Sequence, residues 1–126
     1  MTLQESGEMY LETILILSEK KNDVRSIDIC EEMGFSKPSI SRAIHLLENG
    51  GYLSIDGSGY ITLTDIGREI AEKIYERHKV LTALFVGIGV DEETASEDAC
   101  RIEHVISDKT FKAIKKHMKE HGLKDS

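Results

Sequence analysis

The chain has 126 residues, of which 40% are hydrophobic, and its formal net charge at pH 7 is -7. This size and composition fit a globular protein of one domain or two small subdomains, and no apolar run approaches the ~18 residues that a membrane span needs. The negative charge excludes indiscriminate nucleic-acid binding through a basic surface, and the acidic N-terminus is unlike a secretion signal, so we expect a cytoplasmic protein without membrane contact.

The first segment predicts a helix over about residues 6–20, with Ser6 as its N-cap. Its apolar residues form one broad stripe, and Met9 and Glu12 lie three residues apart on a strip beside that stripe. The two side chains could therefore act together. The alternatives are a methionine that fills the core and a glutamate that is simply solvated.

The next segment predicts two short helices joined by a tight turn. Ser26 caps the first helix, Ile27 lies on its buried side and Gly34 ends it, while Ser36 caps the second helix. This is the pattern of a helix-turn-helix, whose second helix enters the major groove of DNA. The residues that we expect to contact DNA are Lys37, Ser39, Ser41, Arg42 and His45. A merely polar helix face is the alternative.

A change of period after residue 51 indicates a hairpin. The sequence "YLSIDGSGYITLT" alternates apolar and polar residues on both sides of "DGSG". A helix-turn-helix followed by a two-stranded wing is the order of a winged-helix DNA-binding domain, and we expect the wing near Ser58 to approach the DNA backbone. A three-helix bundle without a DNA role is the alternative topology.

The rest of the chain predicts three helices. Thr64 caps a long one, which includes Ile66 on its apolar face and His78 near its middle, and the following two span residues 91–106 and 107–122, the last ended by Gly122. Their apolar residues exceed what they can bury against one another, so we expect a homodimer. The predicted fold is mainly α, with a winged helix-turn-helix domain over 1–63 and a helical domain over 64–126.

Several candidate metal ligands recur at helical spacing. Cys100, Glu103 and His104 lie three and four residues apart and so share one helix face. Together with Met9, Glu12 and His78 they offer thiolate, carboxylate, imidazole and thioether donors, which favour Fe(II), Co(II), Ni(II) or Zn(II) over Mg(II) or Ca(II). An ordinary amphipathic helix with a core cysteine is the alternative, as is a partly buried histidine at position 78. Cys30 is interpreted as a core residue.

Three separated motifs resemble the diphtheria toxin repressor family of metal-dependent transcriptional repressors, including its manganese transport regulator branch. They are "EMYLETI" at 8–14, "RHKVL" at 77–81 and "DACRIEHVISD" at 98–108. The resemblance covers the whole chain. It implies a helical metal-binding and dimerisation domain after the winged helix, and a primary metal site made of Met9, Cys100, Glu103 and His104.

The sequence also departs from both branches of that family. In iron-type members an ancillary site pairs the histidine matching His78 with a glutamate and a second histidine, whereas those positions here hold Thr82 and Ser96. Glu12 resembles the manganese branch, in which the matching glutamate helps to build a two-metal cluster with the histidine matching His78. The resemblance thus implies a hybrid site. We also expect no counterpart of the SH3-like domain that ends the longer members.

The function indicated is a homodimeric repressor that binds palindromic operator DNA when it holds Fe(II) or Mn(II), with Co(II), Ni(II) or Zn(II) able to substitute in vitro. It would control genes of metal homeostasis. One alternative is a winged-helix regulator that senses a small organic ligand. A metallohydrolase or thiol enzyme is a weaker one, because the sequence around Cys100 holds no oxyanion-hole or zinc-protease motif, so we expect no enzymatic activity.

Overall fold

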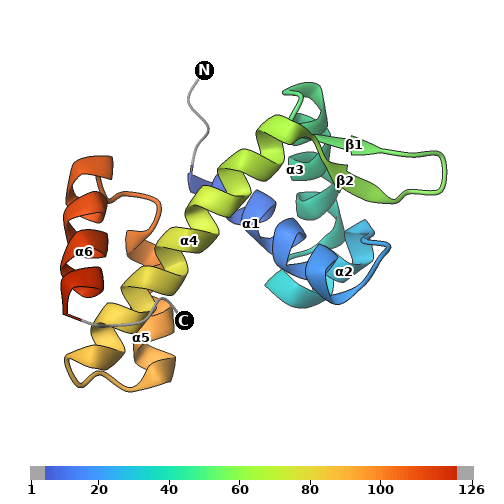
Figure 1. Ribbon diagram of the computed structural model, residues 1–126. Coiled ribbons are helices and arrows are strands. Elements are labelled where there is room, and N and C mark those ends of the chain that lie inside the picture. Colours follow the sequence, from blue (N-terminus) through green and yellow to red (C-terminus); the bar gives the residue numbers. More distant parts are fainter. Residues whose placement is uncertain (1–4, 122–126) are drawn as a thin grey trace. The chain divides into compact units, whose positions relative to one another are not determined.

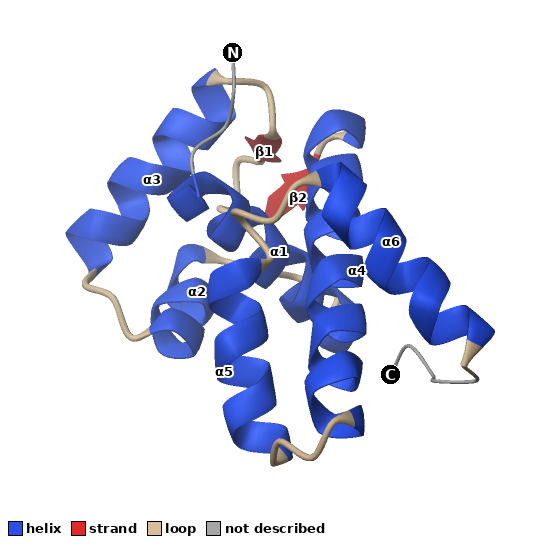
Figure 2. Ribbon diagram, turned by 90° about the vertical axis from the view of Figure 1, so that its left-hand side faces the viewer, coloured by secondary structure: helices blue, strands red, loops and turns tan. Residues whose placement is uncertain are grey.

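The computed structural model describes residues 5–121, which form six helices and one two-stranded sheet (Figure 2). The chain divides into two compact units, residues 1–72 and 73–126. The elements, labelled in Figure 1, are α1 (Glu5–Lys20), α2 (Ser26–Met33), α3 (Lys37–Asn49), β1 (Leu53–Ile55), β2 (Ile61–Leu63), α4 (Asp65–Gly87), α5 (Glu92–Ile102) and α6 (Asp108–Glu120). The mainly α fold and the winged helix-turn-helix are confirmed. Among the described residues, no helix is long and apolar enough to span a membrane.

The core of the N-terminal unit is built from α1 to α3 and the wing. Helix α1 contacts α2, α3 and β2, and Leu11 and Ile14 on its buried side are almost completely shielded from solvent. Ile40 and Ile44 of α3 are equally buried, at the spacing of four that one helix face requires. Burying such side chains stabilises each by about 1.5–3 kcal/mol relative to exposure, so this face holds α3 in place.

Local capping sets the geometry of the helix-turn-helix. Gly34 ends α2 in the left-handed conformation, at φ 72°, and its N–H donates to the Cys30 carbonyl. Ser36 accepts a hydrogen bond from the Ser39 N–H and caps α3, as the sequence predicts. The expected cap at Ser26 is wrong, because Arg25 is the N-cap and the Asp28 carboxylate accepts from the Arg25 N–H at 2.8 Å.

Two further expectations from local pattern are wrong in this unit. Ser6 lies inside α1, which already includes Glu5, so it is not the N-cap of that helix. Ile27 is 43% exposed and does not lie on the buried side of α2. The first error is one of helix boundary, which capping preference leaves uncertain by a residue or two. The second concerns the face of α2, since Ile27 lies inside that helix but does not point into its core.

The wing is an antiparallel hairpin, in which Leu53 pairs with Leu63 and both side chains are buried. The N–H of Ile61 donates to the Val24 carbonyl at 2.7 Å, which ties the wing to the loop after α1. At the tip, the carboxylate of Asp56 accepts hydrogen bonds from the backbone N–H groups of Ser58 and Tyr60 at 2.8 and 2.9 Å. The tip is therefore ordered by its own side chain.

Helix α4 starts in close contact with the residue that precedes the wing. Thr64 caps the helix as predicted, accepting a hydrogen bond from the Gly67 N–H at 3.2 Å. The Thr64 N–H in turn donates to the Tyr52 carbonyl at 3.1 Å. A Cβ placed on Gly67 would lie 1.9 Å from that same carbonyl oxygen. Only glycine fits where the start of α4 meets the start of the wing.

We expect Gly67→Ala to lower the free energy of unfolding by about 1–3 kcal/mol or more, the usual cost of overpacking. The sign of this change shows whether the clash exists, since alanine in place of a helical glycine without a clash would stabilise the helix by about 1 kcal/mol. Urea unfolding followed by circular dichroism measures the change. Gly57→Ala is the matched control, because no atom lies within 4 Å of a Cβ at that position. A Gly67→Ala midpoint equal to or above that of the natural chain would contradict the close contact.

The C-terminal unit has its own small core. Val80 of α4 packs with Phe111 and Met118 of α6, and partly buried residues of the same unit surround them. Asp91 and Ser107 cap α5 and α6 by accepting hydrogen bonds from the N–H groups of residues 94 and 110. The predicted end of the last helix at Gly122 lies outside the described residues.

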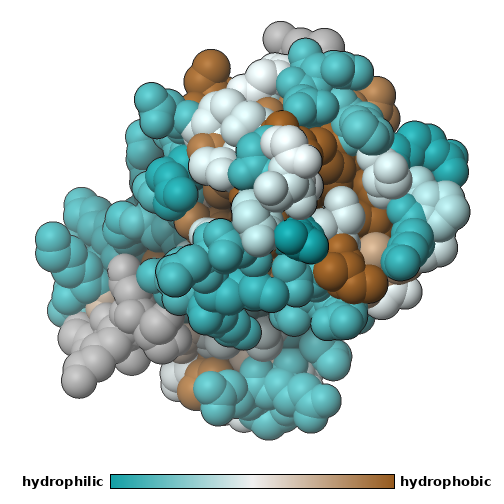
Figure 3. All heavy atoms as spheres, turned by 90° about the vertical axis from the view of Figure 1, so that its right-hand side faces the viewer, coloured by the Kyte–Doolittle hydropathy of each residue, from teal (hydrophilic) through white to brown (hydrophobic). Residues whose placement is uncertain are grey.

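The apolar face predicted for α4 is only partly correct. Ile66 is 61% exposed, and at the other end of the helix Val86 is 43% exposed. Among residues 73–121, Ile88 and Val105 are the other large hydrophobic residues that are exposed. On the side of α2, α3 and the wing, hydrophobic areas are interspersed among hydrophilic side chains (Figure 3). The described surface thus offers apolar side chains for further contacts.

Candidate metal centre

Two of the predicted ligands lie in the turn that follows α5. The spacing predicted that Glu103 and His104 share one helical face with Cys100. The helix instead ends at Ile102, so these two residues lie outside it. Glu103 still has helical backbone angles, φ -57° and ψ -25°, and its N–H donates to the Ala99 carbonyl at 2.9 Å. The chain then turns toward Ser107, the N-cap of α6. The expectation of a continuous helix over 91–106 is therefore wrong.

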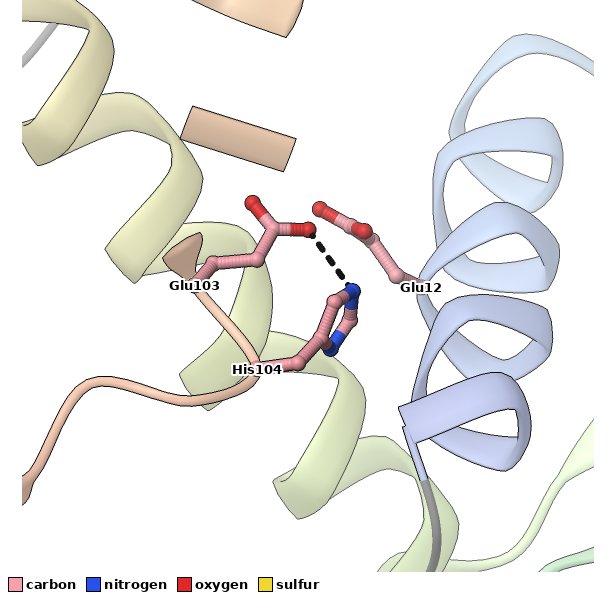
Figure 4. Close-up of side chains that lie close together, drawn as sticks. All are labelled: Glu12, Glu103 and His104. Carbon is pink, nitrogen blue, oxygen red and sulfur yellow. Dashed lines mark ion pairs between the residues drawn. The ribbon is translucent and has the colours of Figure 1, made fainter. Parts of the chain in front are cut away.

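Three of the predicted ligands meet within the C-terminal unit. The carboxylate of Glu103 is fully buried, and its Oε2 lies 2.9 Å from Nδ1 of His78. Its Oε1 lies 3.3 Å from Nε2 of His104, whose side chain is only 3% exposed. Figure 4 shows this second pair, in which both side chains extend from the turn and the carboxylate of Glu103 faces the imidazole ring of His104. Glu103 is thus held between two imidazoles, one from α4 and one from its own turn.

Thr82 and Ser96, the residues at the two positions expected to depart from the iron-type pattern, both contact His78. The hydroxyl of Ser96 lies 3.3 Å from Nε2 of His78, and the Thr82 hydroxyl donates to the His78 carbonyl at 2.7 Å. Thr82 therefore satisfies the backbone of α4, while Ser96 holds the ring nitrogen that faces away from Glu103. Among the described residues, no carboxylate or second histidine replaces them beside that nitrogen. The two ring nitrogens of His78 therefore face Glu103 and Ser96.

The remaining predicted ligands are divided between the units. Cys100 lies on α5 and is half-buried. Met9 and Glu12 lie on α1 in the N-terminal unit, with Met9 half-buried and Glu12 only 6% exposed. Glu12 is therefore not a solvated surface residue, which was one of the two interpretations of the sequence. Its carboxylate is the third side chain drawn in Figure 4.

The chemistry of these donors fits a divalent transition ion. Buried carboxylate and imidazole groups are ligands that Fe(II), Mn(II) and Zn(II) accept, while Mg(II) usually keeps several waters. A buried carboxylate also costs several kcal/mol unless charge compensates it. A divalent cation supplies such compensation, so the Glu103 environment is suited to a positive ion.

Sequence reasoning missed Arg77, the residue before His78. Its side chain is 8% exposed, and its guanidinium donates to the main-chain carbonyls of Glu103 and Ile106 at 3.2 and 2.8 Å and to the carboxylate of Asp108. The sequence carried a signal for it. Arg77 follows Ile74 by three residues within the apolar stripe of α4, where an arginine must find buried partners.

The ion pairs at the start of α6 make the stability of the C-terminal unit depend on pH. The hydrogen bond and charge of Lys73, with the guanidinium of Arg77, lower the pKa of the Asp108 carboxyl. Because the pKa is lower in the folded chain than the usual ~3.9, the ionised carboxylate stabilises the fold above about pH 4. That stabilisation is lost as the pH falls through the lowered value.

We expect Asp108→Asn to lower the urea midpoint at pH 7 in the presence of a chelator. The difference between this variant and the natural chain should shrink as the pH falls below about 4, because the natural carboxylate then becomes protonated. Unfolding curves measured from pH 7 to pH 2.5 test this. A difference that stays constant over the whole range would mean that the charge of Asp108 does not contribute.

The predicted DNA-contacting residues all lie on exposed surface. Lys37, Ser39, Ser41, Arg42 and His45 are exposed along α3, and Ser58 is exposed at the tip of the wing. A shallow surface hollow beside α3 is lined by Pro38, Ser41, Arg42, His45, Leu46 and Asn49. Leu46, which is 68% exposed, adds an apolar side chain to this face that sequence reasoning had not selected. Such a face combines hydrogen-bonding, cationic and apolar groups, as readers of the major groove do.

Two family models together match nearly the whole chain. The model described as "Iron dependent repressor, N-terminal DNA binding domain" matches residues 2–60. The model described as "Iron dependent repressor, metal binding and dimerisation domain" matches residues 64–122. The second match includes His78, Cys100, Glu103 and His104, and the first includes the helix-turn-helix.

Individual relatives agree with these matches. An uncharacterized HTH-type transcriptional regulator of Methanocaldococcus jannaschii is 32% identical over 120 residues, which cover 94% of this chain and 96% of the relative. The iron-dependent repressor IdeR of Mycobacterium tuberculosis is 34% identical over 107 residues, covering 84% of this chain but only 46% of the repressor. A solved manganese-dependent transcriptional repressor in complex with manganese is 27% identical, with a TM-score of 0.83 over 90% of this chain and 52% of its own. This chain therefore spans about half the length of the last two.

Proposed function

Because this chain belongs to the iron-dependent repressor family, which also includes the diphtheria toxin repressor, we propose that it is a homodimeric transcriptional repressor activated by Fe(II) or Mn(II). Its relatives are transcription regulators and not enzymes. The observation that carries the proposal is the buried contact of Glu103 with His78 and His104. The DNA would be a palindromic operator in the cytoplasm, beside genes of metal homeostasis.

The ligands proposed for the ion come from both units. Cys100, Glu103 and His104 would supply donors from α5 and its turn, and Met9 and Glu12 would supply donors from α1, with His78 close by on α4. When bound, the ion would supply positive charge among these donors and a point that both units share. Helix α1 contacts α3 directly, so fixing α1 also fixes the helix that faces DNA.

Fixing α3 in each protomer is what a palindromic operator requires. Half-sites lie about one DNA turn apart, ~34 Å, and two recognition helices must keep that separation. A dimer whose DNA-binding units are not fixed loses conformational entropy when it docks, which weakens operator binding. Exposed Val86, Ile88 and Val105 in the C-terminal unit are available for the contact between protomers.

Charge gives a second reason for dependence on metal. The chain carries a net charge of -7, which repels the phosphates of DNA. The buried carboxylates of Glu12 and Glu103 are part of this negative charge. Carboxylates that share a site repel one another, and a divalent cation offsets that repulsion. The metal-free chain is thus disfavoured on DNA by electrostatics as well as by loose geometry.

The donor set supports iron over manganese among the two candidate ions. Thioether and thiolate ligands such as Met9 and Cys100 suit Fe(II), Co(II), Ni(II) or Zn(II), whereas Mn(II) prefers carboxylate and water. Glu12 and Glu103 supply the oxygen donors that Mn(II) would use. Co(II), Ni(II) or Zn(II) would also bind in vitro, and availability in the cell selects among the ions.

We expect Cys100→Ala and His104→Ala to abolish metal-stimulated operator binding in a mobility-shift assay performed without oxygen. Each variant removes a proposed donor, and losing even a partner that orients a ligand typically weakens metal binding about 10–100-fold. Added Fe(II) or Co(II) should therefore change DNA affinity by less than about a tenth of its effect on the natural chain. The matched controls are Cys30→Ala, the other thiol, and His117→Ala, an exposed histidine on α6. A full response to metal in either His104→Ala or Cys100→Ala would contradict the proposal.

We expect Arg42→Ala to weaken operator binding and to reduce the slope of log K against log salt concentration by about 1, because one phosphate contact is lost. Binding is measured by fluorescence anisotropy from 50 to 300 mM salt with metal in excess. Arg101→Ala is the control, since Arg101 is exposed on α5 and pairs with Asp98. An unchanged slope in Arg42→Ala would remove this residue from the DNA interface.

A further inference from the structure

Arg77 is a buried cation whose contacts all converge on one segment of the C-terminal unit. Its Nη1 donates to the carbonyl of Glu103 at 3.2 Å and to that of Ile106 at 2.8 Å, and its Nη2 donates to the carboxylate of Asp108. The guanidinium also lies 5.5 Å from the centre of the Phe111 ring. One side chain of α4 therefore contacts the beginning and end of the turn between α5 and α6, and the first residue of α6.

The turn needs such a donor. The last carbonyls of a helix have no partner within the helix, and a buried carbonyl without a hydrogen bond is strongly disfavoured. The Glu103 and Ile106 carbonyls flank His104, so a single Nη1 satisfies both while fixing the distance between them. Asp108 draws the guanidinium toward α6 and is itself held by Lys73 at 3.2 Å.

The neighbouring residue on α4 holds the same glutamate by its side chain. Nδ1 of His78 lies 2.9 Å from the Glu103 carboxylate, while Arg77 binds the Glu103 carbonyl. Two consecutive residues of α4 thus fix both the backbone and the carboxylate of Glu103. A ligand held in this way needs no rearrangement of its backbone to accept an ion.

We propose that Arg77 is a positioning residue, which sets the affinity for metal by holding Glu103 and His104 in place without touching the ion. The inference rests on the proposed function, in which these two residues are ligands. Removing partners that orient metal ligands typically weakens metal binding 10–100-fold. Lysine cannot replace arginine here, because its compact ammonium lacks the planar fork that reaches two carbonyls and a carboxylate together.

The test compares Co(II) binding by the full chain and by Arg77→Lys, through the visible absorption of the bound ion. We expect the dissociation constant to rise about 10–100-fold in Arg77→Lys. The matched control is Lys73→Met, which removes the other cation from Asp108 and leaves the carbonyl contacts intact. It should change the constant by less than about fivefold, the most that an exposed ion pair contributes.

Amide hydrogen exchange separates positioning from a general loss of structure. Without metal, at a temperature where circular dichroism shows the variant folded, Arg77→Lys should exchange faster at residues 103–106 only. The core amides of α4 and α6 should exchange as in the natural chain. Faster exchange throughout the unit, or an unchanged Co(II) affinity, would overturn the inference and leave Arg77 with at most a structural role.

Two further variants make every outcome decisive. If Arg77→Lys does not fold, Asp108→Asn takes its place, because it loosens the guanidinium but keeps it present. Its Co(II) affinity should fall below that of Lys73→Met, and equal affinities would overturn the inference. If His104→Ala binds Co(II) as the natural chain does, the proposed metal site itself fails. If His104→Ala loses binding while Arg77→Lys keeps it, only the role of Arg77 fails.

Discussion

The burial of the Glu103 carboxylate constrains everything around it. A charged group with no exposed surface must be paired and hydrogen-bonded, or it destabilises the fold by several kcal/mol. His78 and His104 meet its two oxygens, so α4 and the turn after α5 must lie against each other. The packing of Val80 with Phe111 and Met118 keeps α4 and α6 together, and α6 begins where that turn ends. The small apolar core and the buried acid therefore depend on the same arrangement of helices.

Thr82 and Ser96 both contact His78, one through its backbone and one through its ring. With threonine and serine there, the His78 ring has a hydroxyl on one nitrogen and a carboxylate on the other. It is consequently oriented toward the Glu103 side of the unit. The candidate donors elsewhere in the chain include a thiol at Cys100 and a thioether at Met9.

The sequence predicts what local chemistry decides. The caps at Ser36 and Thr64, the end of α2 at Gly34 and the hairpin follow from residues a few positions apart, and all four are confirmed. The end of α5 at Ile102 was missed, because no glycine or proline marks it. The turn that follows is held by Arg77, a partner 26 residues earlier in the chain.

The candidate site was likewise predictable in its residue types but not in its contacts. The donor types and their spacing are visible in the sequence, but the contacts of Glu103 depend on how α4 packs against the turn. Exposure at the start of α4 was also misjudged, as Ile66 shows. Periodicity identifies the apolar stripe of a long helix but not the length of it that other elements cover.

The hydrogen bonds of Asp56 affect how fast the wing can associate with DNA. Ordering one residue of a flexible loop costs about 1–2 kcal/mol of backbone entropy. The hydrogen bonds of the Asp56 carboxylate already order the wing tip when the chain folds. A collision that brings this tip to a phosphate can therefore lead directly to binding, because the loop has no other conformers to sample first.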